Sequence, residues 1–347
     1  MTAMRPFVVP PAPAGVSAAA TAPSFSVIVA AYQAAVFVGD AVDSALVQTL
    51  PPLEVVVVDD GSTDDIAGAL RRFGDRVRLL RQENGGAASA RNLAVQAARG
   101  DFVVILDADD VFLPDRLEAM AELCRARPDL DVVTTDALLE VDGRSFRRAY
   151  ELGNTFEVED QRRAILRRNF VFGLCAVRRS ALLAAGGFDA SIARTEDWDL
   201  WIRMVLSGSR IGLVDQPLAR YRLRADSLSA DRVLLLRGRC QTLAKTLHNP
   251  LLREDERRVV RESLDTQRRA LELAEARLAL LARRDDARRR ALRIAVGRGH
   301  PLATRLKSAA SALAPRWAAR RLERDGGAAA RASAGFRTAG GDAATRR

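Results

Sequence analysis

Short apolar runs alternate with helix-like segments from Phe25 to Leu130, and this alternation limits the folds that the chain can adopt. The apolar runs are FSVIVAA, LEVVVVD, RVRLLR and DFVVIL, at residues 25–31, 53–59, 76–81 and 101–106. Helical stretches follow each run, the last of them opened by Pro114. Strand, helix, strand, helix at this spacing predicts an α/β fold: a mostly parallel sheet with helices on both faces.

Polar residues gather where these apolar runs end, as Ala31-Tyr32, Asp59-Asp60 and Asp107 to Asp110. The carboxyl ends of parallel strands share one edge of a sheet, so this edge is the expected ligand site. Neighbouring carboxylates repel one another unless a cation or hydrogen-bond donors lie between them. An Asp-x-Asp sequence there suits Mg²⁺ or Mn²⁺, which prefer oxygen ligands. The alternative is a solvated turn in which Asp109 or Asp110 caps the helix after Pro114.

The residue types available for proton transfer in the first 230 residues are limited. Both histidines, His248 and His300, come later, and there is no Walker A lysine loop. A general base in this region would therefore be a carboxylate, with Glu196, Asp197 and Asp199 as candidates. Glu196 could instead cap its helix or orient Asp197, and capping is the favoured role.

Neighbours of these carboxylates have simpler interpretations. Trp198 and Trp201 could stack on a sugar, but core packing is expected for at least one of them. Asp199 and Arg203 are spaced as an ordinary i, i+4 helix pair. Cys175, one of three widely spaced cysteines, lies in an apolar strand and is expected to be a packed thiol.

The second half is less regular. Residues 130–144 predict a strand and a hairpin turn at Asp142-Gly143, residues 170–177 a further strand, and residues 195–208 a helix ended by Gly208. Long helices rich in Ala, Leu and Arg are predicted at about 232–247, 252–297 and 301–322. The domain prediction is a disordered leader at 1–23, an α/β domain at 24–230, a basic α-helical extension at 231–322 and a disordered tail at 323–347.

Charge changes sign along the chain. From Asp231 onward 28 Arg and Lys face 13 Asp and Glu, a net charge of +15, whereas residues 1–230 carry −5. The helices could be a solvated appendage with compositional drift, a basic surface for anionic lipid, or a nucleic-acid site. Aromatic residues are scarce there, so nucleic acid is not expected. The sequence contains no run of eighteen apolar residues, so no membrane span is predicted.

Several ordered motifs together resemble the family 2 glycosyltransferases of the GT-A fold. They are SVIVAAYQAA, VVVVDDGSTDD, ENGGAASARNLAV, GDFVVILDADD, GGFDASIARTEDWDLWIRM and the looser YRLRADSLS. The resemblance runs from Phe25 to about Ser229, roughly 60% of the chain. It implies an inverting transfer of a sugar from a nucleoside diphosphate, most simply a UDP-sugar, to a saccharide or lipid-linked saccharide acceptor.

The resemblance also implies roles for particular residues. Asp197 would be the general base and Asp109 the ligand of a divalent cation, Mn²⁺ or Mg²⁺. The remaining donor-binding residues would be Ala30 and Tyr32 in the nucleotide pocket, Asp60 and Arg91 at the nucleobase, Asp107 at the ribose or sugar, and Arg224 at the diphosphate. The rival interpretations are a catalytically idle nucleotide-sugar-binding protein and a sugar nucleotidyltransferase, whose Gly- and Lys-rich loop is missing.

Three departures from the family pattern matter. Ala30 and Gln33 replace the usual Pro and Asn of the first loop, where contacts are largely made by the backbone. Arg224 stands where many relatives carry His, so the metal would have one protein ligand fewer, while arginine can clamp a diphosphate. The Gln-x-x-Arg-Trp signature of processive synthases is missing, which favours single transfers. The expected setting is cell-envelope glycan synthesis in the cytoplasm, peripheral to the inner face of the plasma membrane.

Overall fold

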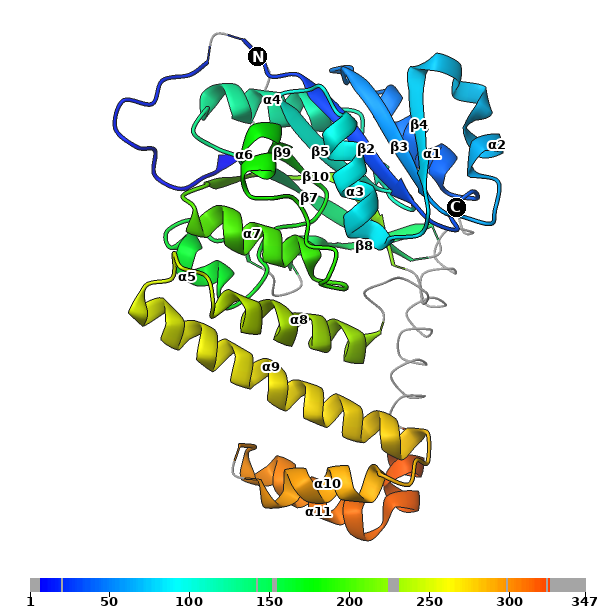
Figure 1. Cartoon of the computed structure of the whole chain (residues 1–347), viewed down its shortest axis with the longest axis vertical. Helices are drawn as coiled ribbons and strands as arrows, with labels where there is room; N and C mark the ends of the chain where they lie inside the picture. Colours follow the sequence, from blue (N-terminus) through cyan, green and yellow to red (C-terminus); the bar gives the residue numbers. More distant parts are fainter. Residues whose placement is uncertain are drawn as a thin grey trace, which may run out of the picture. The chain divides into compact units, whose positions relative to one another are not determined.

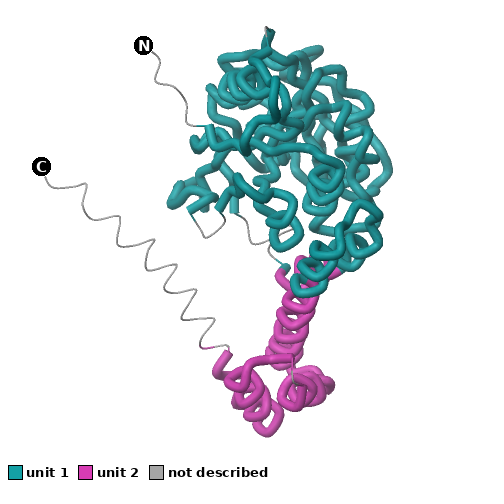
Figure 2. Tube along the Cα trace, turned by 90° about the vertical axis from the view of Figure 1, so that its left-hand side faces the viewer, with its two compact units in different colours: residues 1–231, 241–263 teal, residues 232–240, 264–347 magenta. Residues whose placement is uncertain are grey.

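The computed structural model describes residues 7–19, 21–141, 143–151, 155–223, 231–297, 299–322 and 324. It divides into two compact units: residues 1–231 with 241–263, and residues 232–240 with 264–347. Figure 2 colours the first teal and the second magenta. The α/β domain was predicted to end at residue 230, but residues 241–263 also belong to its compact unit.

Unit 1 is built on one mixed sheet with strand order β1-β10-β7-β9-β5-β2-β3-β4 (Figure 1). Strands β2 (Phe25–Ala31), β3 (Glu54–Asp60), β4 (Val77–Gln82) and β5 (Phe102–Asp107) are parallel to one another. Strands β7 (Val132–Val141) and β10 (Ile211–Arg222) form a second parallel pair, and β9 (Cys175–Arg178) lies antiparallel between β7 and β5. The predicted α/β class and mostly parallel sheet are confirmed.

Helices cover both faces of the sheet because both faces are apolar. Alternate residues of the central strands, such as Val27, Val55 and Val104, share a core with α1 (Val38–Leu46) and α4 (Arg116–Ala126). The intervening residues are also buried, and α3 (Gly86–Ala97) packs on β2 and β3. Strands buried on both sides read as continuous apolar runs, which is why β2, β3 and β5 could be predicted from the sequence, whereas the edge strand β4 is largely exposed.

The remaining elements of unit 1 are shorter. The predicted hairpin is present as β7 with β8 (Arg144–Arg148), and Asp142 of its turn lies outside the described residues. The other elements are β6 (Val111–Phe112), α2 (Ile66–Leu70), η1 (Arg71–Arg76), η2 (Ala149–Glu151), α5 (Gln161–Ile165), α6 (Arg179–Ala184) and α7 (Glu196–Leu206). Strand β9 begins later than the apolar run at 170–177, and Gly208 follows α7 with a φ of 103°.

The prediction that the leader is disordered is wrong for residues 7 and 8. Phe7–Val8 form β1, which pairs antiparallel with Leu213 and Val214 of β10. The carbonyls of Pro10 and Pro11 accept hydrogen bonds from Arg127 and Arg210. A stretch rich in Pro and Ala is therefore held by backbone pairing, which composition does not reveal.

The helical region also differs from prediction. It contains α8 (Arg232–Thr246), α9 (Glu254–Leu281), α10 (Ala287–Val296) and α11 (Leu302–Leu313), with helical residues again at 315–322. A single helix over 252–297 is wrong, because the chain turns between α9 and α10, where Arg283 has a φ of 51°. The predicted tail at 323–347 lies outside the described residues except for 324. Among the described residues no helix has the length and apolarity needed to cross a membrane.

Candidate functional site

The carboxyl ends of β2, β3 and β5 bring the predicted polar clusters to one edge of the sheet. Ala30 pairs with Asp107 of β5 and, on its other side, with Val58 of β3. Ala31 is in register with Asp59. Residues that are far apart in the sequence thus meet because parallel strands begin and end together.

The loop after β2 is fixed by the loop after β3. The Gln33 amide donates to Ser62 Oγ at 3.1 Å, and the Ala35 amide donates to Asp64 Oδ2 at 2.7 Å. Gln33 adopts a φ of 50°, which turns the chain sharply. Tyr32 remains 53% exposed, so its ring is accessible to a ligand while Ala30 beneath it is half-buried.

Asp60 is nearly fully buried and organises the start of α3. Its Oδ1 accepts hydrogen bonds from Gln82 Nε2 at 2.7 Å and the Gly85 amide at 2.8 Å, and its Oδ2 accepts from the Gly86 amide at 2.9 Å. A carboxylate offers about four acceptor positions. A nucleobase donor would therefore have to use the position that remains on Oδ2, and this role of Asp60 stays a prediction.

Arg91 connects the end of β5 to the start of α7. Its Nη2 donates to Asp107 Oδ1 at 2.8 Å and its Nη1 to Glu196 Oε1 at 2.7 Å. The guanidinium also lies over the ring of Phe188, 5.6 Å from its centroid. Burial alone would lower the pKa of Arg91, but the charges of Asp107 and Glu196 raise it overall, so the side chain is cationic. The expected cover over a nucleobase stays a prediction, because these contacts already engage the guanidinium.

Asp197 is the carboxylate at the start of α7 with the acid–base properties expected of a general base. Its Oδ2 accepts from Asn169 Nδ2 at 2.9 Å, and its Oδ1 accepts from the Trp198 amide at 2.6 Å. Burial and the charge of Glu196 raise the pKa of Asp197 to about 6, against the lowering effect of these hydrogen bonds. Asn169 was missed in the sequence, since nothing in its local pattern ties it to a residue 28 positions away.

Glu196 does not cap its helix. Thr195 is the N-cap residue of α7, with no side-chain capping bond, and Glu196 binds Arg91 instead. The expectation that Glu196 caps the helix is therefore wrong. Its carboxylate instead lies beside Asp197, where its negative charge raises the pKa of Asp197. Trp198 and Trp201 are both almost fully buried, which confirms core packing. Cys175 is also buried, as predicted.

The acidic cluster after β5 spans very different environments. The Asp107 side chain is 35% exposed, Asp109 is half-buried in a turn, and Asp110 is 1% exposed. Asp110 Oδ1 accepts from the Arg222 amide at 2.8 Å, and burial together with Asp107 raises the pKa of Asp110 well above its ordinary value. The capping alternative is wrong, because α4 begins only at Arg116 with Asp115 as its N-cap.

The donor set at this edge suits a hard divalent cation that shares its shell with phosphate. The described residues contain no group of three or more His, Cys, Asp or Glu placed to hold a metal by themselves. Asp107 and Asp109 supply two carboxylates, and Mg²⁺ commonly uses one or two protein carboxylates with substrate phosphates and water. Arg224, the expected diphosphate clamp, lies outside the described residues.

Helix α8 supports the helix that carries Asp197. Thr242 Oγ1 lies 2.9 Å from Thr195 Oγ1, and both residues are buried. Lys245 Nζ lies 2.6 Å from Asp189 Oδ2 and 2.9 Å from the Asp199 carboxylate, which also pairs with Arg203 as predicted. The segment 241–263 therefore packs with α7, although the sequence analysis assigned it to the basic extension.

Lys245→Met should lower the free energy of unfolding by about 1–3 kcal/mol, the range for a hydrogen bond to a charged group. Lys245, together with hydrogen bonds from Ser191, lowers the pKa of Asp189 from 3.8 to about 2, so the stabilisation is present above pH 3.8 and is lost as the pH falls toward 2. Urea unfolding at pH 7 and near pH 3 measures the difference. Arg163→Met is the control, because its pair with Asp255 is exposed and should contribute less than about 1 kcal/mol. Equal losses for both variants would contradict the support role.

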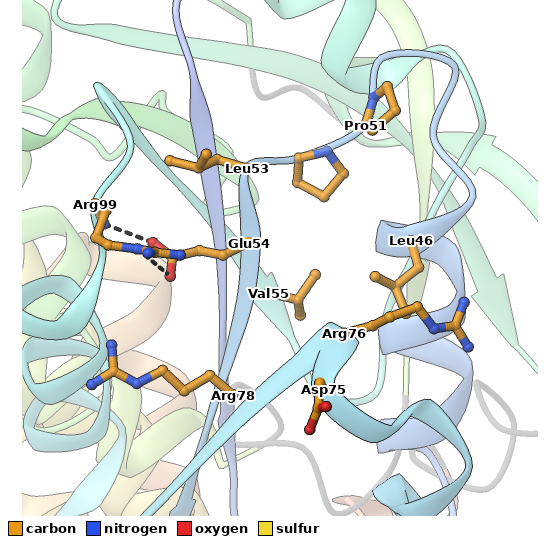
Figure 3. Close-up of a pocket in the computed structure, with 10 residues that line it drawn as sticks. Leu46, Pro51, Leu53, Glu54, Val55, Asp75, Arg76, Arg78 and Arg99 are labelled. Carbon is orange, nitrogen blue, oxygen red and sulfur yellow. Dashed lines mark hydrogen bonds and ion pairs between the residues drawn. The ribbon is translucent and has the colours of Figure 1, made fainter.

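A separate pocket of about 510 Å³ lies at the opposite end of the strands (Figure 3). It is lined by Pro51, Leu53, Glu54 and Arg99 among others, and Arg99 is bonded to Glu54 on one side of it. Glu54 is the first residue of β3, whereas Asp60 and Asp107 of the site are the last residues of β3 and β5. The pocket therefore does not belong to the site.

Comparison with known proteins relates this chain to glycosyltransferases. Residues 26–185 match the family described as glycosyl transferase family 2. An uncharacterised glycosyltransferase of Rickettsia prowazekii is 30% identical over 186 residues, which cover 52% of this chain and 58% of that protein. A Bacillus subtilis protein named as the teichuronic acid biosynthesis glycosyltransferase TuaG is 29% identical over 214 residues, covering 60% of this chain and 83% of its own length.

Two solved structures share the fold. S. aureus TarS 1–349 in complex with UDP-GlcNAc superposes with a TM-score of 0.59 at 18% identity, covering 83% of this chain and 91% of that one. A mannosyltransferase from Pyrobaculum calidifontis in complex with GDP-Man and Mn²⁺ gives a TM-score of 0.60 at 23% identity, covering 94% of this chain and 84% of that one. At these identities the likeness shows the fold.

Proposed function

We propose that this chain, whose residues 26–185 match glycosyl transferase family 2 and whose sheet has the GT-A fold, transfers a sugar from a nucleoside diphosphate to an acceptor hydroxyl. The observation that best supports this proposal is that Arg91 binds both Asp107 and Glu196. It thereby joins the donor edge of the sheet to the helix of Asp197. An acid-base carboxylate and a cation-binding edge within one site are what a single-displacement transfer requires.

The transfer requires two functions, removal of a proton from the acceptor and neutralisation of the leaving diphosphate. Asp197 accepts the proton of the acceptor hydroxyl as its oxygen bonds to the anomeric carbon. The bond from that carbon to the diphosphate breaks, and the nucleoside diphosphate leaves with the electron pair. One displacement with one base inverts the anomeric centre. When bound, a divalent cation held by Asp109 beside Asp107 would neutralise the leaving diphosphate.

The finer assignments extend this proposal. A UDP-sugar is the first donor to test, since TarS was solved with UDP-GlcNAc, although the mannosyltransferase was solved with GDP-Man. The acceptor would be a saccharide or lipid-linked saccharide of the cell envelope, as the name of TuaG suggests. Transfer would be non-processive, and the protein would act in the cytoplasm, in part at the inner face of the plasma membrane.

A donor-hydrolysis screen tests the proposal most directly. Purified protein is incubated with UDP-, GDP- and dTDP-sugars and Mn²⁺, and the released nucleoside diphosphate is measured. One nucleotide class should be hydrolysed slowly without acceptor and faster with saccharide acceptors. Binding of a donor without release under any condition would support the catalytically idle alternative instead.

The pH dependence of transfer should report the ionisation of Asp197. The base must be deprotonated, so the rate should fall about tenfold per pH unit below a pKa near 6 and level off above it. Glu196→Gln removes a negative charge that raises this pKa, so the acid limb should shift to lower pH while the plateau survives. Loss of the plateau in Glu196→Gln would make Glu196 the base.

A further inference from the structure

The helices of unit 2 arrange their apolar residues in an unusual order. Helices α10 and α11 pack against each other, and the small core nearby consists of Ala279, Leu280, Ala287 and Ala318. Within α11 the buried residue is Ala312, at 1% exposure. Alanines thus make up most of this interior, with Leu280 and Ile294 as its larger buried side chains, although further large apolar side chains are available in α11.

Those larger side chains lie on the surface. Leu302 is 66% exposed, Leu306 62%, Leu313 80% and Trp317 51%. Leu302, Leu306 and Leu313 are spaced by four and seven residues and so lie along one side of α11, and Trp317 lies in the helical segment that follows the break at Ala314. We call these four residues the α11 stripe. Scattered single leucines on a surface need no explanation, but an aligned stripe with alanines beneath it indicates a binding surface.

The charge around the α11 stripe restricts what can cover it. Residues 282–322 contain twelve Arg and Lys against two Asp and no Glu. Arg316, Arg320 and Arg321 surround Trp317 in the sequence, and the Arg321 guanidinium lies 5.5 Å from the centre of its ring. Lys307 follows Leu306 directly. The occupant must therefore accept large apolar side chains and carry negative charge beside them.

We propose that the α11 stripe docks unit 2 on a membrane containing anionic lipids. Leucine and tryptophan would enter the boundary between headgroups and acyl chains, and the flanking arginines would contact the lipid phosphates. A second copy of the chain would bring two strongly basic surfaces together, and nucleic acid would leave the leucines without apolar contact. The proposal concerns binding alone and does not depend on the transfer reaction.

Trp317 provides the measurement. Trp198 and Trp201 are buried, so quenching of tryptophan fluorescence by acrylamide reports mainly on Trp317. Full-length protein with vesicles of phosphatidylglycerol and phosphatidylcholine should show a blue-shifted emission and reduced quenching. Vesicles of phosphatidylcholine alone should have a much smaller effect. Binding should weaken as NaCl rises from about 50 to about 500 mM, because salt screens the arginines.

Matched variants separate the stripe from general basic attraction. The double variant Leu306→Ser, Leu313→Ser should reduce vesicle affinity by about tenfold or more, since apolar burial contributes to interfacial binding. Leu278→Ser is the control: Leu278 is 47% exposed on α9, outside the stripe, and its change should leave affinity unaltered. Circular dichroism verifies that both variants keep wild-type helicity.

Three outcomes would overturn the proposal. Unchanged affinity in the double variant would remove the stripe from binding, and equal binding to neutral vesicles would remove the requirement for anionic lipid. Sedimentation that shows self-association without vesicles, abolished by the same double variant, would assign the stripe to a second copy of the chain.

Discussion

Asp197→Asn should leave donor affinity nearly intact while transfer falls by roughly two to four orders of magnitude, the usual contribution of a general base. Asparagine has almost the same shape and can still accept a hydrogen bond from Asn169, whose Nδ2 lies 2.9 Å from Asp197 Oδ2. What it cannot do is take a proton from the acceptor. Nucleotide binding by calorimetry and transfer under single-turnover conditions separate these two properties.

A surface carboxylate provides the control for this variant. Asp43 pairs with Arg72 and is about half exposed, so Asp43→Asn should retain activity within about twofold, as expected of exposed ion pairs. Near-normal transfer by Asp197→Asn would locate the base elsewhere, and Glu196 would be tested next. A similar loss in both variants would indicate a general effect of removing charge.

Asp109→Ala should abolish turnover and remove the part of donor affinity that depends on Mn²⁺. The reason is that the departing diphosphate would lose the cation that neutralises its charge. Donor affinity is measured with and without Mn²⁺, and unfolding by urea verifies that the variant is folded. Asp75→Ala is a suitable control, because Asp75 lines the pocket at the opposite end of the strands.

Chelation gives an independent test of the same role. Wild-type protein in EDTA should lose transfer, and added Mn²⁺ should restore it. Full activity in EDTA would exclude the metal role of Asp109. It would leave a cationic clamp such as Arg224 as the source of diphosphate neutralisation.

The sheet and its ligand edge could be predicted because they depend on local patterns. Strands buried on both faces produce apolar runs, and the register that aligns Ala30 with Asp107 follows from parallel pairing. The partners of Arg91 could not be predicted in this way. Glu196 is 105 positions away in the sequence, and no local pattern ties the two side chains to each other.

The helical region shows the complementary limitation. The apolar periodicity of α9 brings Val259, Val260 and Leu264 to a buried face. It could not show that 241–263 belongs to the first compact unit, nor that the helix stops near Arg283, where no Gly or Pro interrupts the sequence. Buried alanines such as Ala312 carry little apolar signal, so the sequence alone does not show which face of α11 is packed.

The short pairing of Phe7–Val8 with β10 has a consequence for handling the protein. A strand at the margin of a sheet offers unpaired amide and carbonyl groups that can recruit another chain. β1 occupies those groups at Leu213 and Val214, and both of these side chains are apolar and buried. Deleting the first twenty residues would uncover this template, and the shortened protein should aggregate at concentrations at which the full chain stays dispersed.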